Sequence, residues 1–297
     1  MTTFFVLLRR NVKLFFKDKG MFFTALITPL ILLVLYATFL GKVYRDSFLS
    51  SLPEGVTVAD TLLNGFVGGQ LISSILAVSC VTVAFCSNML MVQDKVTGAR
   101  RDLTVSPVKP AVLAVSYYTA TLLSTLLICL VATAVCLGYM AVTGWYMTVG
   151  DVLLLLLDVL LLSLFGTALS SVVSFFLSSQ GQISAVGTIV SSGYGFICGA
   201  YMPISQFPEG LQKAISFLPG TYGTALMRSH ALQGVAEAME AEGLPEPVIT
   251  AMLEAVDCRV DFFGSAVPVP VMYAILAGSV ALLMGVYVLL YRVKGKK

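Results

Sequence analysis

The segment 93–107 carries the most chemically informative residues of the chain. They are charges of both signs around a glycine and before a Ser-Pro stop: Asp94, Lys95, Gly98, Arg100, Arg101, Asp102, Leu103, Ser106 and Pro107. Carboxylates and cations on one short helix can form directional ion pairs with a complementary protein surface. Long apolar stretches precede and follow this segment. A compact charged helix between two membrane spans is suited to exchange mechanical work with a soluble partner.

Asp158 is the second candidate for chemistry, because charged residues inside apolar spans commonly mark ion or proton pathways. Asp151 falls at the start of its apolar stretch, where a helix N-cap explains it. Asp158 lies two turns deeper on the same face. Both a buried neutral acid and a proton relay remain open at this position.

The sequence has few residues that could support metal binding, nucleotide binding or catalysis. The chain has one histidine, His230, expected outside the membrane, and its six cysteines match no metal-site spacing. No G-x-x-x-x-G-K-[ST] nucleotide loop occurs, and the loops on the basic side are too short for an ATPase domain. We therefore predict no metal site, no cofactor and no enzyme activity on this chain.

The composition places the charged segment in a membrane protein. The chain is 58% hydrophobic and 11% charged, whereas about a quarter of residues are charged in soluble domains. Six apolar stretches are long enough to cross a bilayer as helices, which takes about 20 residues: 20–40, 66–92, 111–142, 151–177, 181–202 and 267–291. The predicted fold is an all-α polytopic protein with one six-span domain, 20–297, and both termini on one side.

Basic residues indicate which side that is. Of 18 Lys and Arg, 13 lie before residue 20, in 93–110 or in the C-terminal tail, whereas 203–266 holds eight acids and three bases. Because Lys and Arg near span ends are retained in the cytoplasm, both termini are predicted to be cytoplasmic and 203–266 external. The basic balance is thus explained by topology, and no nucleic-acid partner is expected.

The N-terminal segment 1–19 is predicted to be an amphipathic interfacial helix. One face carries Phe5, Leu8, Val12, Phe15 and Phe16, and the opposite face Arg9, Arg10, Lys13 and Lys17. Such a helix lies in the interface with anionic lipid, so the bilayer is a partner. Its basic face could serve as a membrane anchor or contact a cytoplasmic protein, and both interpretations stay open.

Small residues recur along two spans. The fifth carries Gly187, Ser191, Gly195 and Gly199, and the second carries Ser73, Ala77, Cys80, Ala84 and Ser87. Rows of small side chains let helices approach closely. We expect these two helices either to pack on each other or to line a variable path.

The segment 203–222 is too apolar for a solvated loop and too rich in proline for a span. A short re-entrant or interfacial helix, 209–218, between Pro208 and Pro219 fits both properties, and a rigid external turn is the alternative. Two short acidic helices, 228–241 and 245–257, are expected to follow as an external hairpin.

In this order, the basic helix, the charged segment after the second span and the proline-rich segment after the fifth resemble the type 2 ABC exporter permeases. These are the membrane subunits of bacterial multidrug, antibiotic and polysaccharide exporters. The resemblance implies that the charged segment is the coupling helix, which contacts an ATP-binding cassette subunit through Asp94, Lys95, Gly98, Arg100, Arg101, Leu103, Ser106 and Pro107. The family often has an acid at the position of Arg101, so the polarity of the contact differs here.

The resemblance also implies the rest of the assembly. Mg-ATP would bind the partner subunit, and a second permease, identical or different, would complete the path in a bacterial cytoplasmic membrane. The second and fifth spans would flank that path through Ser73, Ala77, Ala84, Gly187, Ser191, Gly195 and Gly199. An external gate would be formed by Pro203, Phe207, Pro208, Leu218, Pro219 and Tyr222. The apolar spans favour a hydrophobic or amphipathic substrate, such as a drug, an antibiotic, a peptide or a lipid-linked compound.

Two other functions stay open. A related membrane subunit could sense an antibiotic at the acidic external hairpin and confer immunity with little transport. A secondary transporter could instead use a proton gradient through Asp158.

Overall fold

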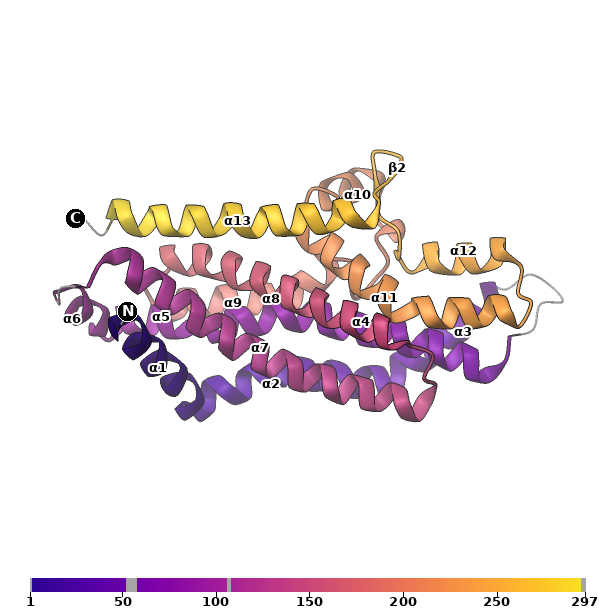
Figure 1. Cartoon of the computed structure of the whole chain (residues 1–297), viewed down its shortest axis with the longest axis horizontal. Coiled ribbons are helices and arrows are strands. Elements are labelled where there is room, and N and C mark those ends of the chain that lie inside the picture. Colours follow the sequence, from indigo (N-terminus) through magenta and orange to yellow (C-terminus); the bar gives the residue numbers. More distant parts are fainter. Residues whose placement is uncertain (1, 52–57, 106–107, 295–297) are drawn as a thin grey trace.

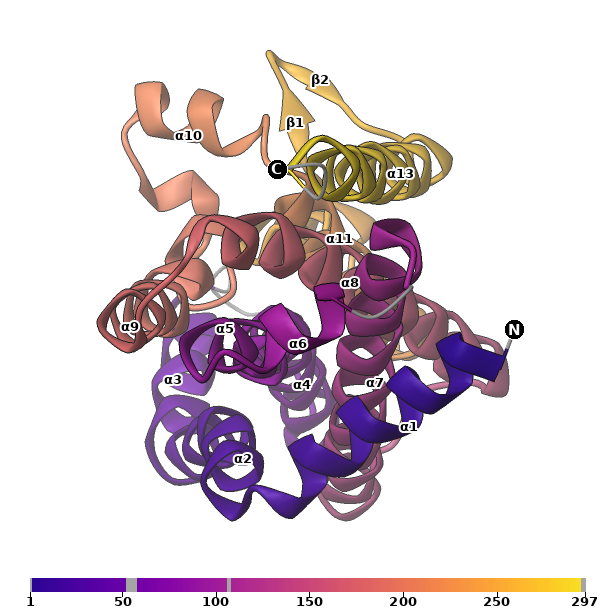
Figure 2. The same cartoon turned by 90° about the vertical axis from the view of Figure 1, so that its left-hand side faces the viewer.

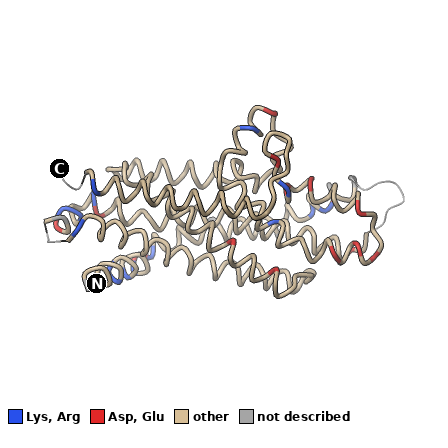
Figure 3. The backbone as a smooth tube through the Cα atoms, turned by 45° about the horizontal axis from the view of Figure 1, so that its top comes forward, with Lys and Arg blue, Asp and Glu red and all other residues tan. Residues whose placement is uncertain are grey.

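The computed structural model describes residues 2–51, 58–105 and 108–294. The chain forms an elongated bundle of helices with both termini at the same end (Figure 1). We call this the terminal end and the other the opposite end. Lys and Arg gather at the terminal end, and acidic residues are concentrated towards the opposite end (Figure 3). This separation agrees with the sidedness expected from the sequence.

The elements follow one another along the chain with short connections. In order they are α1 (Thr2–Lys17), α2 (Lys19–Leu35), the π-helical turn η1 (Tyr36–Leu40), α3 (Gly41–Ser51), α4 (Asp60–Ser87), α5 (Met89–Val96), α6 (Ala99–Val105), α7 (Pro110–Thr143), α8 (Val149–Phe176), α9 (Gln180–Ile197), the 3-10 turn η2 (Ile204–Gln206), α10 (Glu209–Ile215), α11 (Pro219–Ala241), α12 (Glu246–Ala255), β1 (Asp261–Phe262), β2 (Ser265–Ala266) and α13 (Val269–Lys294).

Within the described residues, five helical stretches are long and apolar enough to cross a membrane. They are Lys19–Asp46, Asp60–Val96, Pro110–Thr143, Val149–Phe176 and Val269–Val293. The chain is therefore an all-α multi-pass membrane protein. The predicted span 181–202 corresponds to α9, which has 18 residues and begins with Gln180 and Gln182. Its crossing of the membrane stays a prediction, because polar residues at its start lower its hydropathy.

Helix α4 is the centre of the bundle and packs against α2, α7, α8, α9 and α11. Within its most apolar 18-residue window, 94% is buried. Glycines allow the close approaches: a Cβ at Gly69 would lie 2.8 Å from the Ala231 carbonyl oxygen of α11, and one at Gly166 of α8 would lie 2.9 Å from that of Cys80. Lipid supplies no hydrophobic driving force between helices, so membrane helices associate through close packing, which small residues allow.

The segment after α9 differs from the expectation. Helix α10 begins after Pro208 as predicted, but it ends at Ile215, and Figures 1 and 2 show that it stands off the bundle. The part that enters the bundle is α11, whose residues 220–228 are all buried between α4, α8 and α13. The first predicted hairpin helix, 228–241, is thus only the second half of this longer helix. Glycines explain the burial, since a Cβ at Gly223 would lie 2.6 Å from the Leu162 side chain.

Helix α1 crosses α7 obliquely at the terminal end (Figure 2). Leu7, Asn11 and Phe15, which follow one another at four-residue spacing, form its buried face. Phe5 is 61% exposed, in line with a lipid-facing role. Arg9 is exposed, whereas Arg10 is half-buried on another face of α1.

Candidate functional site

The charged segment folds into two short helices, α5 and α6, which we call the knob. It projects from α4 at the terminal end of the bundle (Figure 1). Gly98 separates the two helices with a φ of +85°, a backbone conformation in which glycine has no steric cost. The sequence thus breaks the long second span into a span and a compact knob.

Asp94 fastens the knob to its own bundle. Its side chain is buried, and Arg10 Nη1 and Nη2 donate hydrogen bonds of 2.7 and 3.0 Å to its two carboxylate oxygens. Tyr117 of α7 donates a third bond, of 2.5 Å, to Oδ2. A bidentate guanidinium pair is among the strongest directional contacts in proteins. Helices α1, α5 and α7 are therefore joined at one carboxylate.

Lys95 makes a second attachment, to the end of α8. Its Nζ donates to the backbone oxygens of Ser174, Phe175 and Leu177 at 2.7 to 2.8 Å. The last carbonyls of a helix lack intrahelical partners and carry a partial negative charge. Lys95 thus caps α8 and holds the knob against it.

Aromatic side chains complete the attachment. The Arg100 guanidinium lies 5.0 Å from the ring centroid of Tyr291 and 5.8 Å from that of Phe175. Tyr287 and Tyr291 of α13 both donate to the Met91 sulfur, at 3.3 and 3.2 Å. These side chains therefore tie the knob to α1, α7, α8 and α13, and its helix α5 also packs against α9.

The predicted coupling residues thus divide into two groups. Asp94, Lys95 and Arg100 contact the bundle and Asp94 is buried, and the expected contact of these residues with a partner subunit stays a prediction. Arg101 is exposed, as are Asp102 and Val105 beside it, whereas Leu103 is half-buried. Ser106 and Pro107 lie outside the described residues.

Asp158 is the centre of a second polar cluster, towards the opposite end. His230 Nδ1 of α11 lies 2.6 Å from its Oδ2, and Tyr273 of α13 donates a 2.7 Å hydrogen bond to its Oδ1. The Asp158 side chain has no exposed area, and that of His230 is 7% exposed. His230 is thus buried inside the helix bundle, beside Asp158 of the apolar helix α8, and its expected position outside the membrane stays a prediction.

Arg228, two residues before His230 on α11 and on nearly the opposite face, is also buried. Its guanidinium donates to the carbonyls of Val256 and Gly199 and to the Ser74 hydroxyl of α4. Asp257 Oδ2 lies 3.7 Å from Arg228 Nη1. Burial raises the pKa of Asp257 above its ordinary value, although Arg228 opposes that rise. Arg228 thus joins α11 to α4 and to the ends of α9 and α12.

The two helices that carry the small-residue rows pack against each other, which is one of the two arrangements expected, although not every residue of the rows makes that contact. Helices α4 and α9 are in contact, but Gly195 and Gly199 accommodate the Tyr201 ring and Ile204 in the loop after α9. Gly187 lies near Met89 of α5, and Ser191 is half-buried.

On α4, Ser73, Ala77 and Ala84 are buried within this one chain. A Cβ at Gly166 of α8 would lie 3.3 Å from that of Ala84. These three residues therefore face the interior of one bundle in this conformation, and their role in a path between two permeases stays a prediction.

The predicted gate residues lie along the connection from α9 to α11. Pro203 and Tyr222 are buried, Phe207 and Pro219 half-buried, and Pro208 and Leu218 exposed. The Tyr222 hydroxyl donates a 2.6 Å hydrogen bond to the Ser216 carbonyl and so ties α11 to α10. Gating by these residues stays a prediction.

Sequence reasoning missed the partners of both buried carboxylates. Tyr117 and Tyr273 lie within apolar stretches and carry no spacing signal. Asn11, an amide between Leu7 and Phe15 on one face, was the available sign that α1 packs on protein as well as on lipid. The run of small residues around Gly220 and Gly223 was the corresponding sign that α11 is a packed helix.

Comparison with known proteins agrees with this architecture. The model of the ABC-2 type transporter family matches residues 2–232, which include α1, the knob and most of α11. No curated protein matches the chain. The matched region is the membrane domain of such transporters and holds no nucleotide-binding domain, consistent with the chain itself not being an ATPase. Because it covers more than half of the sequence, the chain belongs to the ABC-2 type transporter family as a multi-pass permease subunit.

Proposed function

We propose that this permease exports a hydrophobic or amphipathic substrate from the cytoplasm or inner leaflet, with energy from ATP hydrolysis on a separate subunit. Members of the family normally pair with an ATP-binding subunit. The proposal rests on the knob, which is fastened inward to four helices and exposes Asp102 and Val105 outward. A force applied to its exposed side would be passed to the bundle.

The attachments determine which helices such a force would move. Displacement of the knob would pull on α1 and α7 through Asp94 and on the end of α8 through Lys95. Packed interfaces switch between discrete arrangements instead of deforming smoothly. Closure of an ATPase dimer carrying Mg-ATP would therefore tilt these helices together and move the permease between inward and outward states.

A second permease, identical or related, would complete the path, in a bacterial cytoplasmic membrane with both termini inside. The clustering of basic residues at the terminal end supports this orientation (Figure 3). The substrate needs only different affinities for the two states. The scarcity of charged residues within the five apolar helices supports an apolar or amphipathic substrate.

Co-purification tests the energy source of transport before the substrate is identified. The tagged full-length chain is isolated from its native membrane in mild detergent, and its partners and ATP hydrolysis are measured. We expect a P-loop ATPase to co-purify, and Arg101→Glu to lower its recovery severalfold. Lys213→Glu, an exposed cation of α10 far from the knob, is the matched control and should keep the ATPase. A chain that comes out alone and hydrolyses no ATP contradicts the proposal.

A proton-driven transporter is the second candidate, favoured by the cluster around Asp158. A buried carboxylate beside a histidine can exchange a proton near neutral pH. In proteoliposomes without an ATPase, this candidate requires transport of a lipophilic test dye driven by a pH gradient and abolished by Asp158→Asn. Transport that needs ATP and survives this substitution rejects it.

A further inference from the structure

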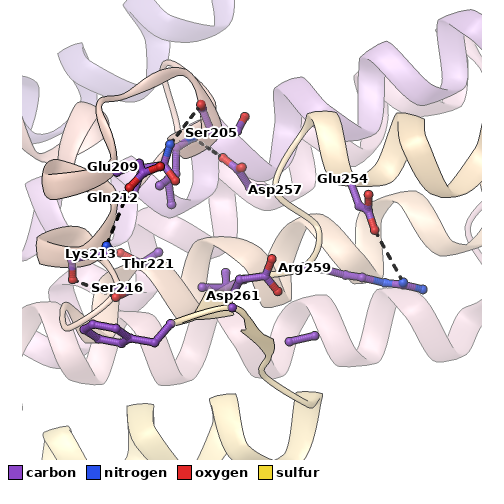
Figure 4. A pocket seen from close by; sticks show the side chains of 15 residues that line it. Ser205, Glu209, Gln212, Lys213, Ser216, Thr221, Glu254, Asp257, Arg259 and Asp261 are labelled. Carbon is purple, nitrogen blue, oxygen red and sulfur yellow. Dashed lines mark hydrogen bonds and ion pairs between the residues drawn. The ribbon is translucent and has the colours of Figure 1, made fainter.

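A cavity of about 730 Å³ lies beside the bundle, between α10, the end of α12 and the β1–β2 hairpin (Figure 4). Pockets of roughly 300 to 1,000 Å³ hold drug-sized molecules in proteins. The hairpin leads directly into α13, the start of a predicted span. The cavity is thus placed near the membrane boundary on the side away from the termini.

The cavity walls carry more negative than positive charge. Two of the acids have weak local ion pairs, Glu209 with Lys213 along α10 at 3.8 Å and Glu254 with Arg259 at 4.0 Å. A third acid, Asp257, faces the buried Arg228. The fourth, Asp261 of β1, is exposed and has no ion pair within the described part of the chain. The site therefore favours a cation, with Asp261 as its contact.

One aromatic ring lines this cavity, and two more pack against that ring. Phe263 lines it and packs with Phe217 and Phe262, with ring centroids 4.9 to 5.9 Å apart. Phe217 is 64% and Phe263 60% exposed. Such a contiguous exposed apolar group marks a contact for a ligand or a membrane. We call these three residues the aromatic cluster.

The backbone at Phe263 indicates that its ring has a use. Phe263 and Gly264 form the two-residue turn between β1 and β2, with φ of +52° and +84°. Turns of this kind prefer Asn-Gly, because a bulky residue at positive φ is strained. The chain keeps a large ring where a small polar residue would fit the backbone better, and strain of this kind often lies at binding sites.

We propose that this cavity binds a cationic amphiphile, a molecule with a protonated amine and an apolar body. The amine contacts Asp261, and the body lies on the Phe263 ring and the rest of the aromatic cluster. The proposal does not depend on how the permease is driven.

The test uses the full-length chain in nanodiscs of phosphatidylcholine, a zwitterionic lipid without net charge. The fluorescent amine dansylcadaverine is titrated against its N-acetyl derivative, which has the same body without the charge. We expect saturable binding of the amine above the signal of empty nanodiscs. Asp261→Asn should weaken it about threefold to fivefold, as expected for an exposed ion pair, and Glu242→Gln, an exposed acid outside the cavity, should not.

Phe263→Asn separates binding from folding. It relieves the turn, so the hairpin should be as stable as before or more so, while dansylcadaverine affinity falls about fivefold from the lost apolar contact. Wild-type affinity in both Asp261→Asn and Phe263→Asn overturns the proposal. Equal binding of the amine and its acetylated form also overturns it, because the aromatic cluster is then a lipid contact.

Discussion

Two buried carboxylates, Asp94 near the terminal end and Asp158 towards the opposite end, are built alike but differ in their basic partner. Each accepts a hydrogen bond from a tyrosine, Tyr117 or Tyr273. Asp94 pairs with Arg10, whose side chain is 30% exposed, whereas Asp158 pairs with the buried His230. Arginine stays charged at every physiological pH, and histidine does not. The first cluster is therefore a permanent fastening, whereas the second has no permanently charged partner.

The largest expected effect concerns the permanent cation near the opposite end. Replacing Arg228 with Met should destabilise the protein by about 3 to 5 kcal/mol, because Asp257 and the carbonyls of Gly199 and Val256 lose their common partner. The six buried free cysteines allow a thermal measurement, since a thiol-reactive dye labels them only on unfolding.

Arg228→Lys is the control for charge without the forked geometry and should recover part of the loss. If Arg228→Met melts like the wild type, Arg228 does not hold α11 to α4 and to the ends of α9 and α12.

Asp94→Asn tests the permanent fastening at the terminal end. It removes the ion pair but keeps a hydrogen-bond acceptor for Tyr117, so a loss of about 1 to 3 kcal/mol is expected, reduced by the partial exposure of Arg10. ATP hydrolysis by the purified complex should continue while substrate transport falls, because the knob then moves without α1.

The converse outcome would be informative. If Asp94→Asn and Arg10→Gln each leave the ratio of transport to ATP hydrolysis unchanged, the carboxylate only stabilises the fold and does not transmit force.

Asp158→Asn should have a smaller effect on stability, about 1 to 2 kcal/mol, because the amide oxygen can still accept from Tyr273. A double-mutant cycle with His230→Gln measures the coupling between the two side chains. A coupling energy that changes between pH 5.5 and 8 supports a cluster that changes its charge. A coupling that is the same at both pH values makes it a fixed fastening like the one at Asp94.

The sequence was sufficient to predict the elements whose signal extends over many consecutive residues. Hydropathy identified the segments that became α4, α7, α8 and α13, and the glycine at position 98 marked the knob, because each signal depends on backbone and lipid alone. The clusters were less accessible. Whether Arg10 turns to lipid or to Asp94 is decided by the packing of α1 on α7.

The same limit applies to α11. Its mean hydropathy resembles that of an external helix, and only contacts such as that of Gly223 with Leu162 place it in the bundle. With α11 misplaced, Arg228 and His230 could not be assigned to buried sites. Long-range contacts of single side chains, absent from any local pattern, determine both clusters.

Lys95→Met gives the smallest expected change in stability, about 1 kcal/mol, because the α8 carbonyls lose their cationic cap. Lys109→Met, an exposed lysine at the start of α7, is the matched control and should leave melting and transport unchanged. If Lys95→Met lowers transport per ATP hydrolysed as much as Asp94→Asn does, force enters the bundle through α8 as well as α1. If it changes melting alone, Lys95 is only a cap, and the fastening at the terminal end consists of Asp94 and its two partners.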